Sequence, residues 1–168
     1  MPSLTPFETR LDERLRLIVT SYQRLTGKEL LPSFTAKNAA HGTIEGTDPE
    51  SSVLHHAVWN APRAIVAHGT EDDPLFFYGN RLALQLFEMS FDEFTRLPSR
   101  LSAEPLAQQA RVELLEKVTR HGYVEGYSGI RIAKSGRRFM IVDTTVWNLT
   151  DENGVQHGQA AVFVPQQA

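Results

Sequence analysis

Residues 64–80, AIVAHGTEDDPLFFYGN, and the run RLALQLFEMSFDEF that follows at 81–94 form the stretch that decides the fold. The segments AIVAH and LFFY are rich in β-branched and aromatic residues, which strands favour, and the polar segment GTEDDP joins them. Asn80 then precedes an apolar run, and an asparagine at such a position caps a helix through its side-chain oxygen. The sequence therefore predicts an antiparallel hairpin that leads directly into a helix.

Further helices are predicted on both sides of this hairpin. A short one covers residues 50–59, and Ser90 with Glu93 forms a capping box that begins another after the hairpin. Ser102 is expected to cap a longer helix that ends at Gly122. Its apolar face is predicted to consist of Leu106, Val112, Leu115 and Val118.

Three strands are predicted in the last third of the chain, at residues 123–133, 139–149 and 157–164. Their connections contain Lys-Ser-Gly and Asp-Glu-Asn-Gly, which are typical of hairpin turns. Two strands, several helices and three strands in this order predict an α+β fold. We expect a five-stranded antiparallel sheet with helices on one face.

An amphipathic helix precedes this core. Thr5, Pro6 and Glu8 supply a capping box with proline at the first helical position, and Gly27 is a plausible end. We consider two alternatives: the helix packs on its own domain, or it forms a two-helix seam between subunits. The sequence thus divides into an N-terminal helix and possible dimerisation element at 1–31, a linker or loop at 32–52, and a globular domain at 53–168. The apolar stripe is Leu11, Leu15, Ile18, Tyr22 and Leu25.

Composition excludes several classes of function. The net charge of −3 and the absence of a basic run argue against direct binding of nucleic acid. With no cysteine in the chain, disulfides, thiolate nucleophiles and iron–sulfur clusters are ruled out. No segment approaches the roughly 20 apolar residues that span a bilayer, and no secretory signal is recognised. We therefore expect a cytoplasmic protein without a membrane partner.

The segments AHGTEDDPLFFYGNRLALQLFEMSFDEFTRLPSRLSAEP and YSGIRIAKSGRRFMIVDTTVWNLTDENGVQHGQAAVF resemble the MEKHLA domain, a PAS-related family. The resemblance extends from about Val53 onward. It implies a PAS-like fold and a sensing or regulatory role. The family occurs as stand-alone proteins and at the C-terminus of plant homeodomain–leucine-zipper regulators, but this chain has neither a homeodomain nor a zipper.

Strand parity predicts which side chains meet a ligand, because alternate residues face opposite sides of a sheet. Phe139, Ile141, Asp143, Thr145 and Trp147 should share one face. Similarity of KSGRRF to flavin-binding PAS photoreceptors implies that this face points inward, with Arg131 beside it. The same similarity places Arg131 and Ile141 where those proteins carry flavin-binding amides, so flavin is not expected.

Arg131 and Asp143 are then expected to be neighbours across two strands. A buried guanidinium and a buried carboxylate are costly unless they are paired. Three alternatives follow: the two side chains form a structural ion pair, they hold a polar ligand together, or both face solvent.

His68, Tyr78 and Asn80 complete the set of candidate ligand-binding residues. His68 is either hydrogen-bonded to its own turn, a polar group of the pocket, or a metal ligand or base. No metal site is expected, because the neighbouring histidines of the 50–59 helix point about 100° apart. Haem is also not expected, since the one histidine on the long helix, His121, lies next to the glycine that ends it.

These observations predict a non-enzymatic sensory or regulatory module that binds an unidentified small molecule and acts through a partner or a homodimer. The alternative is a small-molecule enzyme in which His68 works with Asp143 or Asp73 as an acid–base pair. No phosphate-binding glycine loop, zinc-protease motif or serine-hydrolase motif supports the enzyme.

Overall fold

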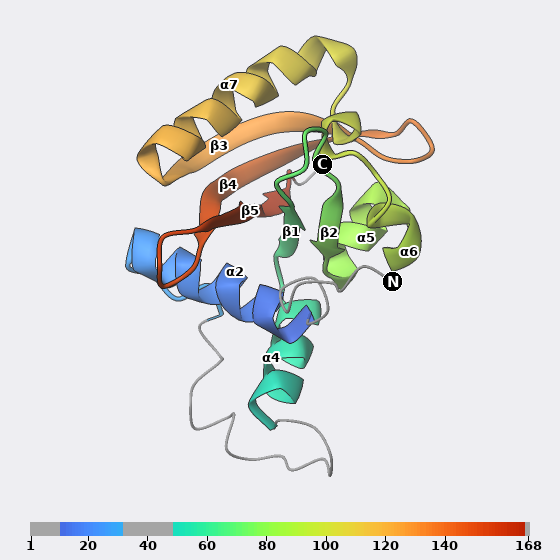
Figure 1. Ribbon diagram of the computed structural model, residues 1–168. Coiled ribbons are helices and arrows are strands. Elements are labelled where there is room, and N and C mark those ends of the chain that lie inside the picture. The colour runs from blue at the N-terminus through green and yellow to red at the C-terminus, as the bar shows by residue number, and fades with distance from the viewer. Residues whose placement is uncertain (1–10, 32–48, 167–168) are drawn as a thin grey trace, which may run out of the picture.

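The structure is a computed structural model that describes residues 11–31 and 49–166 (Figure 1). The capping signals predicted at Thr5 and Glu8, and most of the linker predicted at 32–52, lie outside the described residues. The elements are α2 (Leu11–Thr26), α4 (Pro49–Trp59), β1 (Ala64–His68), β2 (Phe76–Gly79), α5 (Arg81–Phe87), α6 (Phe91–Phe94), the 3-10 turn η1 (Ser99–Ser102), α7 (Pro105–His121), β3 (Tyr123–Ile132), β4 (Arg138–Thr150) and β5 (Gln156–Pro165).

The predicted five-stranded antiparallel sheet is confirmed, with strand order β2-β1-β5-β4-β3. The last strand of the chain, β5, therefore lies in the middle of the sheet between β1 and β4. The predicted hairpin 64–80 forms β1 and β2, and the three later strands differ from their predicted ranges by one residue at most at each end.

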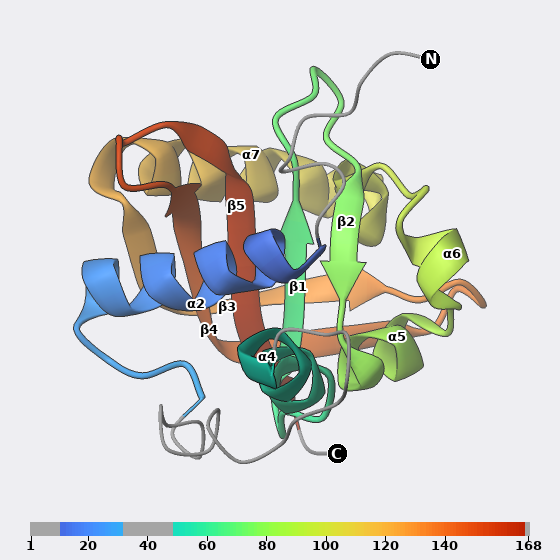
Figure 2. The ribbon, with the colours of Figure 1, turned by 60° about the horizontal axis from the view of Figure 1, so that its bottom comes forward.

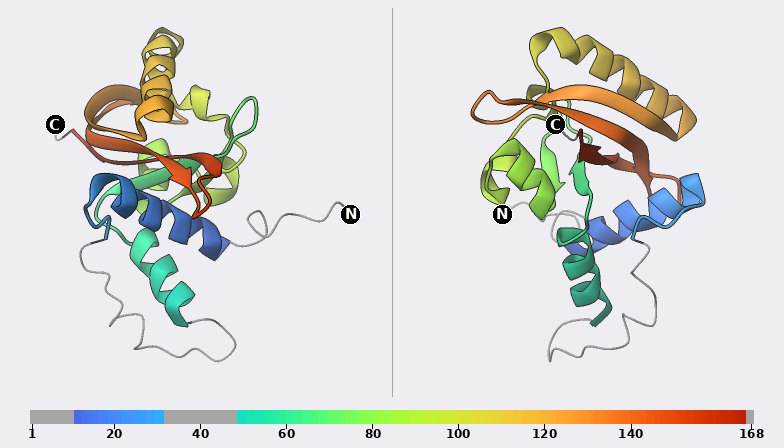
Figure 3. Two further views of the ribbon diagram at one scale, coloured as in Figure 1. Left: turned by 60° about the vertical axis from the view of Figure 1, so that its left-hand side comes forward. Right: turned by 180° about the vertical axis from the view of Figure 1, so that it is seen from behind.

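Helices cover both faces of this sheet. Helices α5 and α6 and the long helix α7 lie against one face, while α2 crosses the other face and α4 packs beside it (Figures 2 and 3). The sheet thus separates two apolar layers. In the part of the chain that the structure describes, no helix is long and apolar enough to span a membrane.

Helix α2 packs on its own sheet through the predicted stripe. Ile18 and Tyr22 are buried, and the Tyr22 ring meets the Trp147 ring edge-on with centroids 4.9 Å apart. The Trp147 indole Nε1 donates a hydrogen bond to the Ile18 carbonyl at 3.2 Å. Ser21 Oγ lies 3.1 Å from the Thr150 carbonyl. The stripe is therefore covered within one chain, as the first of the two alternatives for this helix states, and a seam between subunits would need other residues.

Strand β4 contains a bulge that reverses the direction of its side chains. Val142 pairs with Val164, but the next paired residue, Thr145, lies opposite Val162, so β4 has one extra residue there. Asp143 occupies the bulge with φ 50°, in the left-handed region. The predicted assignment of β4 side chains to the two faces of the sheet is correct as far as Ile141. It is wrong beyond that residue, because the bulge shifts the alternation of side chains by one position.

The bulge predicts an unusual ranking of substitutions at Asp143. Asp143→Gly should leave the free energy of unfolding unchanged or raise it by up to about 1 kcal/mol, because glycine adopts positive φ without steric cost. Asp143→Val should lower it by about 1–2 kcal/mol. Urea unfolding of both variants measures this. At Ser128, an exposed residue of β3 that does not have a positive φ, the ranking should be reversed. The same ranking at both positions would contradict the bulge.

Candidate functional site

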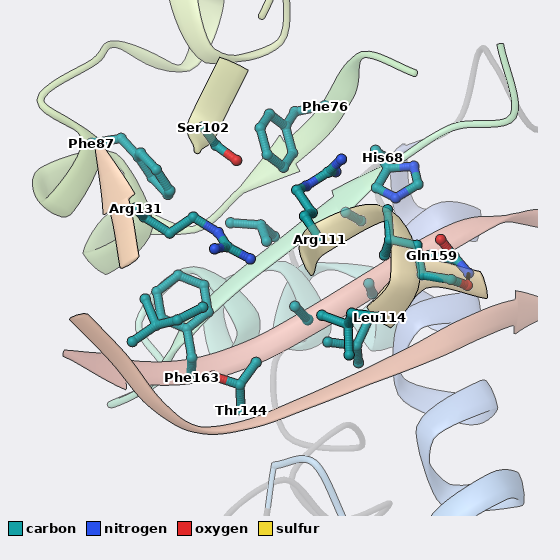
Figure 4. Close-up of a pocket in the computed structure, with 17 residues that line it drawn as sticks. His68, Phe76, Phe87, Ser102, Arg111, Leu114, Arg131, Thr144, Gln159 and Phe163 are labelled. Carbon is teal, nitrogen blue, oxygen red and sulfur yellow. Dashed lines mark hydrogen bonds between the residues drawn. The ribbon is translucent and has the colours of Figure 1, made fainter. Parts of the chain in front are cut away.

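A cavity of about 50 Å³ lies between α7 and the sheet face that carries α5 and α6 (Figure 4). This volume is room for about three to five water molecules, or for a ligand of a few heavy atoms. Most of its wall is apolar, with a few polar groups among the apolar ones, as in small-molecule sites generally. It is lined by Val66, Ala67, His68, Phe76, Phe87, Ser102, Arg111, Leu114, Leu115, Arg131, Ile141, Thr144, Val146, Gln159, Ala160, Ala161 and Phe163.

Arg131 lines this cavity but does not pair with Asp143. The Arg131 side chain extends inward from β3 and is 8% exposed (Figure 4). It donates a hydrogen bond to the Ile130 carbonyl at 2.9 Å and lies over the Tyr127 ring, 5.7 Å from the centroid. Asp143 is exposed at the bulge and is not among the lining residues. The expectation that the two side chains are neighbours is therefore wrong, because the bulge turns Asp143 away.

A second buried arginine, Arg111, was not predicted as a site residue. It extends into the cavity from α7, is 9% exposed, and donates a hydrogen bond from Nη2 to Ser99 Oγ at 2.7 Å. The helix buries Arg111, Leu114 and Val118, which are spaced by three and four residues, whereas Val112 is 45% exposed. The predicted apolar face was thus wrong in assigning Val112 to it, and the N-cap of the helix is Glu104, followed by Pro105, instead of the predicted Ser102.

Burial of Arg111 and its proximity to Arg131 lower the pKa of the Arg111 guanidinium to about 10. The larger cause is loss of hydration, and repulsion by Arg131 adds to it. Arg111 therefore remains positively charged at neutral pH. No Asp or Glu is among the residues that line the cavity.

His68 lies at the end of β1 on the wall of the same cavity. Its Nδ1 lies 3.0 Å from the Gly69 carbonyl, which can only accept, so Nδ1 carries the hydrogen. Burial lowers the pKa of the imidazole and outweighs the Gly69 carbonyl, which raises it; Arg111 lowers it further. Glu71 and the Gln159 side chain oppose this to a smaller extent. His68 is thus both hydrogen-bonded to its own turn and a polar group of the pocket.

Two side-chain atoms of the lining residues are fully buried and have no hydrogen-bond partner in the described part of the chain: His68 Nε2 and Thr144 Oγ1. Thr144 is fully buried on β4. The Gln159 Nε2, by contrast, lies 3.1–3.3 Å from three acceptors, the Leu115 carbonyl, Thr119 Oγ1 and Asn148 Oδ1, which its two hydrogens share. A buried polar atom without a partner costs about 1–3 kcal/mol, so the two free atoms mark where a ligand or water can bind.

The other predicted site residues occupy different positions. Ile141 lines the cavity as expected. Phe139 packs beside it, with its ring 5.1 Å from that of Phe87, and does not line it. Thr145 and Tyr78 are also buried but not among the lining residues. Tyr78 belongs to the core layer that contacts α2, and burial raises the pKa of its phenol.

The side-chain amide of Asn80 forms all of its hydrogen bonds with the backbone of the fold. Its Oδ1 accepts hydrogen bonds from the backbone N–H of Ile65 at 3.0 Å and of Ala83 at 3.2 Å. Its Nδ2 donates to the carbonyls of Val58 and Arg63 at 3.0 and 2.9 Å. Asn80 therefore caps α5 and ties three segments together, and no hydrogen-bonding capacity remains for a ligand.

A flavin does not fit the cavity described here. The volume of about 50 Å³ is well below the several hundred Å³ of typical cofactor sites. The position expected for a flavin-binding amide is occupied by the charged Arg131, and Arg111 extends into the same space. His121, the only candidate considered for a haem ligand, is exposed at the end of α7. Among the described residues, no group of three His, Cys, Asp or Glu side chains is arranged for a metal ion.

Comparison with solved structures identifies the fold as that of a PAS domain. A PAS domain from Colwellia psychrerythraea superimposes with a TM-score of 0.58 at 16% identity, over 66% of this chain and 92% of that one. A PAS domain from a two-component sensor histidine kinase gives 0.56 at 18% identity, over 70% and 96%. A third, from a LuxR-family transcriptional regulator of Burkholderia thailandensis in complex with ethanol, gives 0.53 at 16% identity, over 67% and 96%.

The chain belongs to the MEKHLA domain family, whose sequence profile matches residues 12–167. The match includes α2 as well as the segments on which the resemblance rested. The homeobox-leucine zipper protein ATHB-14 of Arabidopsis thaliana is 23% identical over 154 residues, and HOX9 of Oryza sativa is 24% identical over 149. Each alignment covers 89% of this chain but only 16% of the plant protein.

Asn80→Ala should be much more destabilising than the loss of an ordinary helix cap. It removes four hydrogen bonds, three of them buried, and leaves the backbone N–H groups of Ile65 and Ala83 without this acceptor, so we expect the free energy of unfolding to fall by about 3 kcal/mol or more. The matched control is Ser90→Ala, which removes the exposed capping box of α6 and should cost about 1 kcal/mol. Chemical unfolding measures both, and equal losses would contradict the structural role assigned to Asn80.

The lowered pKa of His68 predicts a stability that falls in mild acid. The ordinary pKa is 6.5 and the folded value is lower, so below about pH 6.5 the unfolded chain binds a proton that the folded chain resists. The free energy of unfolding should therefore decrease by up to about 1.4 kcal/mol per pH unit in this range, until the folded imidazole also protonates. Thermal melts from pH 7.5 to 5 should show a smaller decrease for His68→Gln than for the natural sequence. An equal decrease would contradict the assignment.

Proposed function

We propose that this protein is a non-enzymatic sensory or regulatory module that binds a small molecule in the cavity between α7 and the sheet. The observation that carries the proposal is the pair of unpartnered buried atoms, Thr144 Oγ1 and His68 Nε2, in the wall of that cavity. Water or a ligand satisfies such atoms, and the surrounding apolar wall favours a ligand with an apolar part.

The geometry supports binding better than acid–base catalysis. The acids considered as partners of His68 are Asp143 and Asp73, and both are exposed and outside the cavity wall. Asp73 instead accepts hydrogen bonds from Arg100 at 3.0 and 3.3 Å. Two groups that act together as an acid–base pair on one substrate need to reach the same site, with the base about 2.6–3.2 Å from the atom whose proton it takes. Neither carboxylate is in that position.

Comparisons with known proteins support a sensory role. Two of the similar solved structures come from a sensor histidine kinase and a transcriptional regulator, and the second holds ethanol, a ligand of a few heavy atoms. A ligand of that size suits a cavity of about 50 Å³. The change caused by ligand binding would be transmitted to a partner protein or to a second copy of the chain, as a sensory domain controls a separate effector domain.

Filling the cavity should abolish ligand binding. The probes are alcohols, amides, amines and carboxylates of about six heavy atoms or fewer, tested by thermal shift. A compound present at 100 times its Kd adds about 2.7 kcal/mol, which raises the Tm of a chain of this size by roughly 5–10 °C. We expect a saturable shift with at least one class of probe, and its loss in Ala161→Leu, which places a larger side chain at the cavity wall.

Ala110→Leu is the matched control, because it makes the same change at an exposed position of α7. It should bind the probes as the natural sequence does. If no probe shifts the Tm of the natural sequence, or if every shift persists in Ala161→Leu, the cavity is not a binding site and the proposal is wrong.

A further inference from the structure

The two arginines of the cavity are largely buried and have no carboxylate partner among the residues of its wall. Arg111 and Arg131 are each more than nine-tenths buried, yet no carboxylate lines the cavity and neither arginine forms an ion pair with a described residue. Burying a charge costs several kcal/mol unless a counter-charge and hydrogen bonds compensate for it. A second buried charge of the same sign nearby increases that cost.

Most N–H donors of the two guanidinium groups have no acceptor among the described residues. Each group has five N–H donors. In the described part of the chain, Arg111 donates one hydrogen bond, to Ser99 Oγ, and Arg131 donates one, to its neighbour's carbonyl. The planar fork of a guanidinium matches a carboxylate, to which it can donate two parallel hydrogen bonds. The free donors lie on residues that come from two separate elements, α7 and β3 (Figure 4).

The neutral groups of the wall add one more donor. The Thr144 hydroxyl has no partner and is fully buried, so it can donate to a bound oxygen. The Ser102 hydroxyl already donates to the Ser99 carbonyl at 2.7 Å. His68 Nε2 has no hydrogen at neutral pH, since Nδ1 carries it, and therefore does not contribute a donor there. The cavity wall therefore has three groups with hydrogen-bond donors that lack a protein acceptor: the guanidinium groups of Arg111 and Arg131 and the hydroxyl of Thr144.

We propose that the cavity binds a small aliphatic carboxylate, with its oxygens held by Arg111 and Arg131 and by the Thr144 hydroxyl. This inference rests on the proposed function, because it names the chemical class of the ligand for the same cavity. A carboxylate places both charged oxygens at one end and leaves its hydrocarbon part to the apolar wall. A phosphate fits less well, because its oxygens point in all directions and some would face apolar side chains. That wall includes Leu114, Ile141, Val146 and Phe163.

The test compares pairs of compounds with the same shape and different charge on the full chain at pH 7.5. Calorimetric titration with sodium propionate should give saturable binding, and propionamide should bind at least tenfold more weakly. Sodium chloride at equal ionic strength should have no such effect. Inorganic phosphate should also bind at least tenfold more weakly than propionate.

Variants of single arginines show which positive charges bind the carboxylate. Arg111→Gln and Arg131→Gln should each weaken propionate binding by about tenfold or more, since charge-assisted hydrogen bonds are the strong ones. Arg100→Gln is the control: it removes an exposed arginine that is paired with Asp73 outside the cavity, and it should leave the affinity unchanged. The propionate–propionamide comparison on the natural sequence needs no variant, so the test stands even if a variant does not fold.

The outcomes separate this inference from the proposed function. If propionamide or propanol binds as tightly as propionate and Ala161→Leu abolishes the binding, the cavity is a ligand site but the carboxylate assignment is wrong. If phosphate binds as tightly as propionate, the site is a general anion site and the assignment is again wrong. If no compound binds, both proposals are wrong.

Discussion

The bulge at Asp143 is the constraint on which the two-layer arrangement of this domain depends. Before it, Ile141 faces the cavity; beyond it, Thr144 and Val146 face the cavity while Trp147 faces α2. Without the extra residue, Trp147 would point into the cavity and Thr144 would lie under α2. One residue with φ 50° therefore places the largest fully buried side chain of the described core on one face and the polar wall of the cavity on the other.

Much of the fold could be predicted from local sequence, because each signal has a local physical cause. The aromatic run before Asn80, the capping box at Ser90 and the hairpin turns act within a few residues, and the structure confirms them. The stripe on α2 predicted a buried face correctly but could not distinguish the chain's own sheet from a second subunit, since both offer the same apolar environment.

The candidate site was less predictable, because it depends on two departures from regular patterns. The bulge carries aspartate instead of the glycine that would have marked it, so parity failed after Ile141. Arg111 lies on the buried face of α7, in phase with Leu114 and Val118, where a charged residue interrupts an apolar pattern. An arginine in phase with a buried stripe was the signal that could have found it. The predicted apolar face did not include Arg111 and included Val112, which is exposed.

The position of Trp147 gives the protein a natural optical reporter. Along β4, Val146 lines the cavity, and the next residue, Trp147, faces α2 and donates its indole N–H to the Ile18 carbonyl. The emission of an indole depends on its hydrogen bond and on the polarity around it. A single peptide unit thus separates the Trp147 indole from a residue of the cavity wall. The docking of α2 on the sheet can therefore be followed by the fluorescence of Trp147 without attaching a dye.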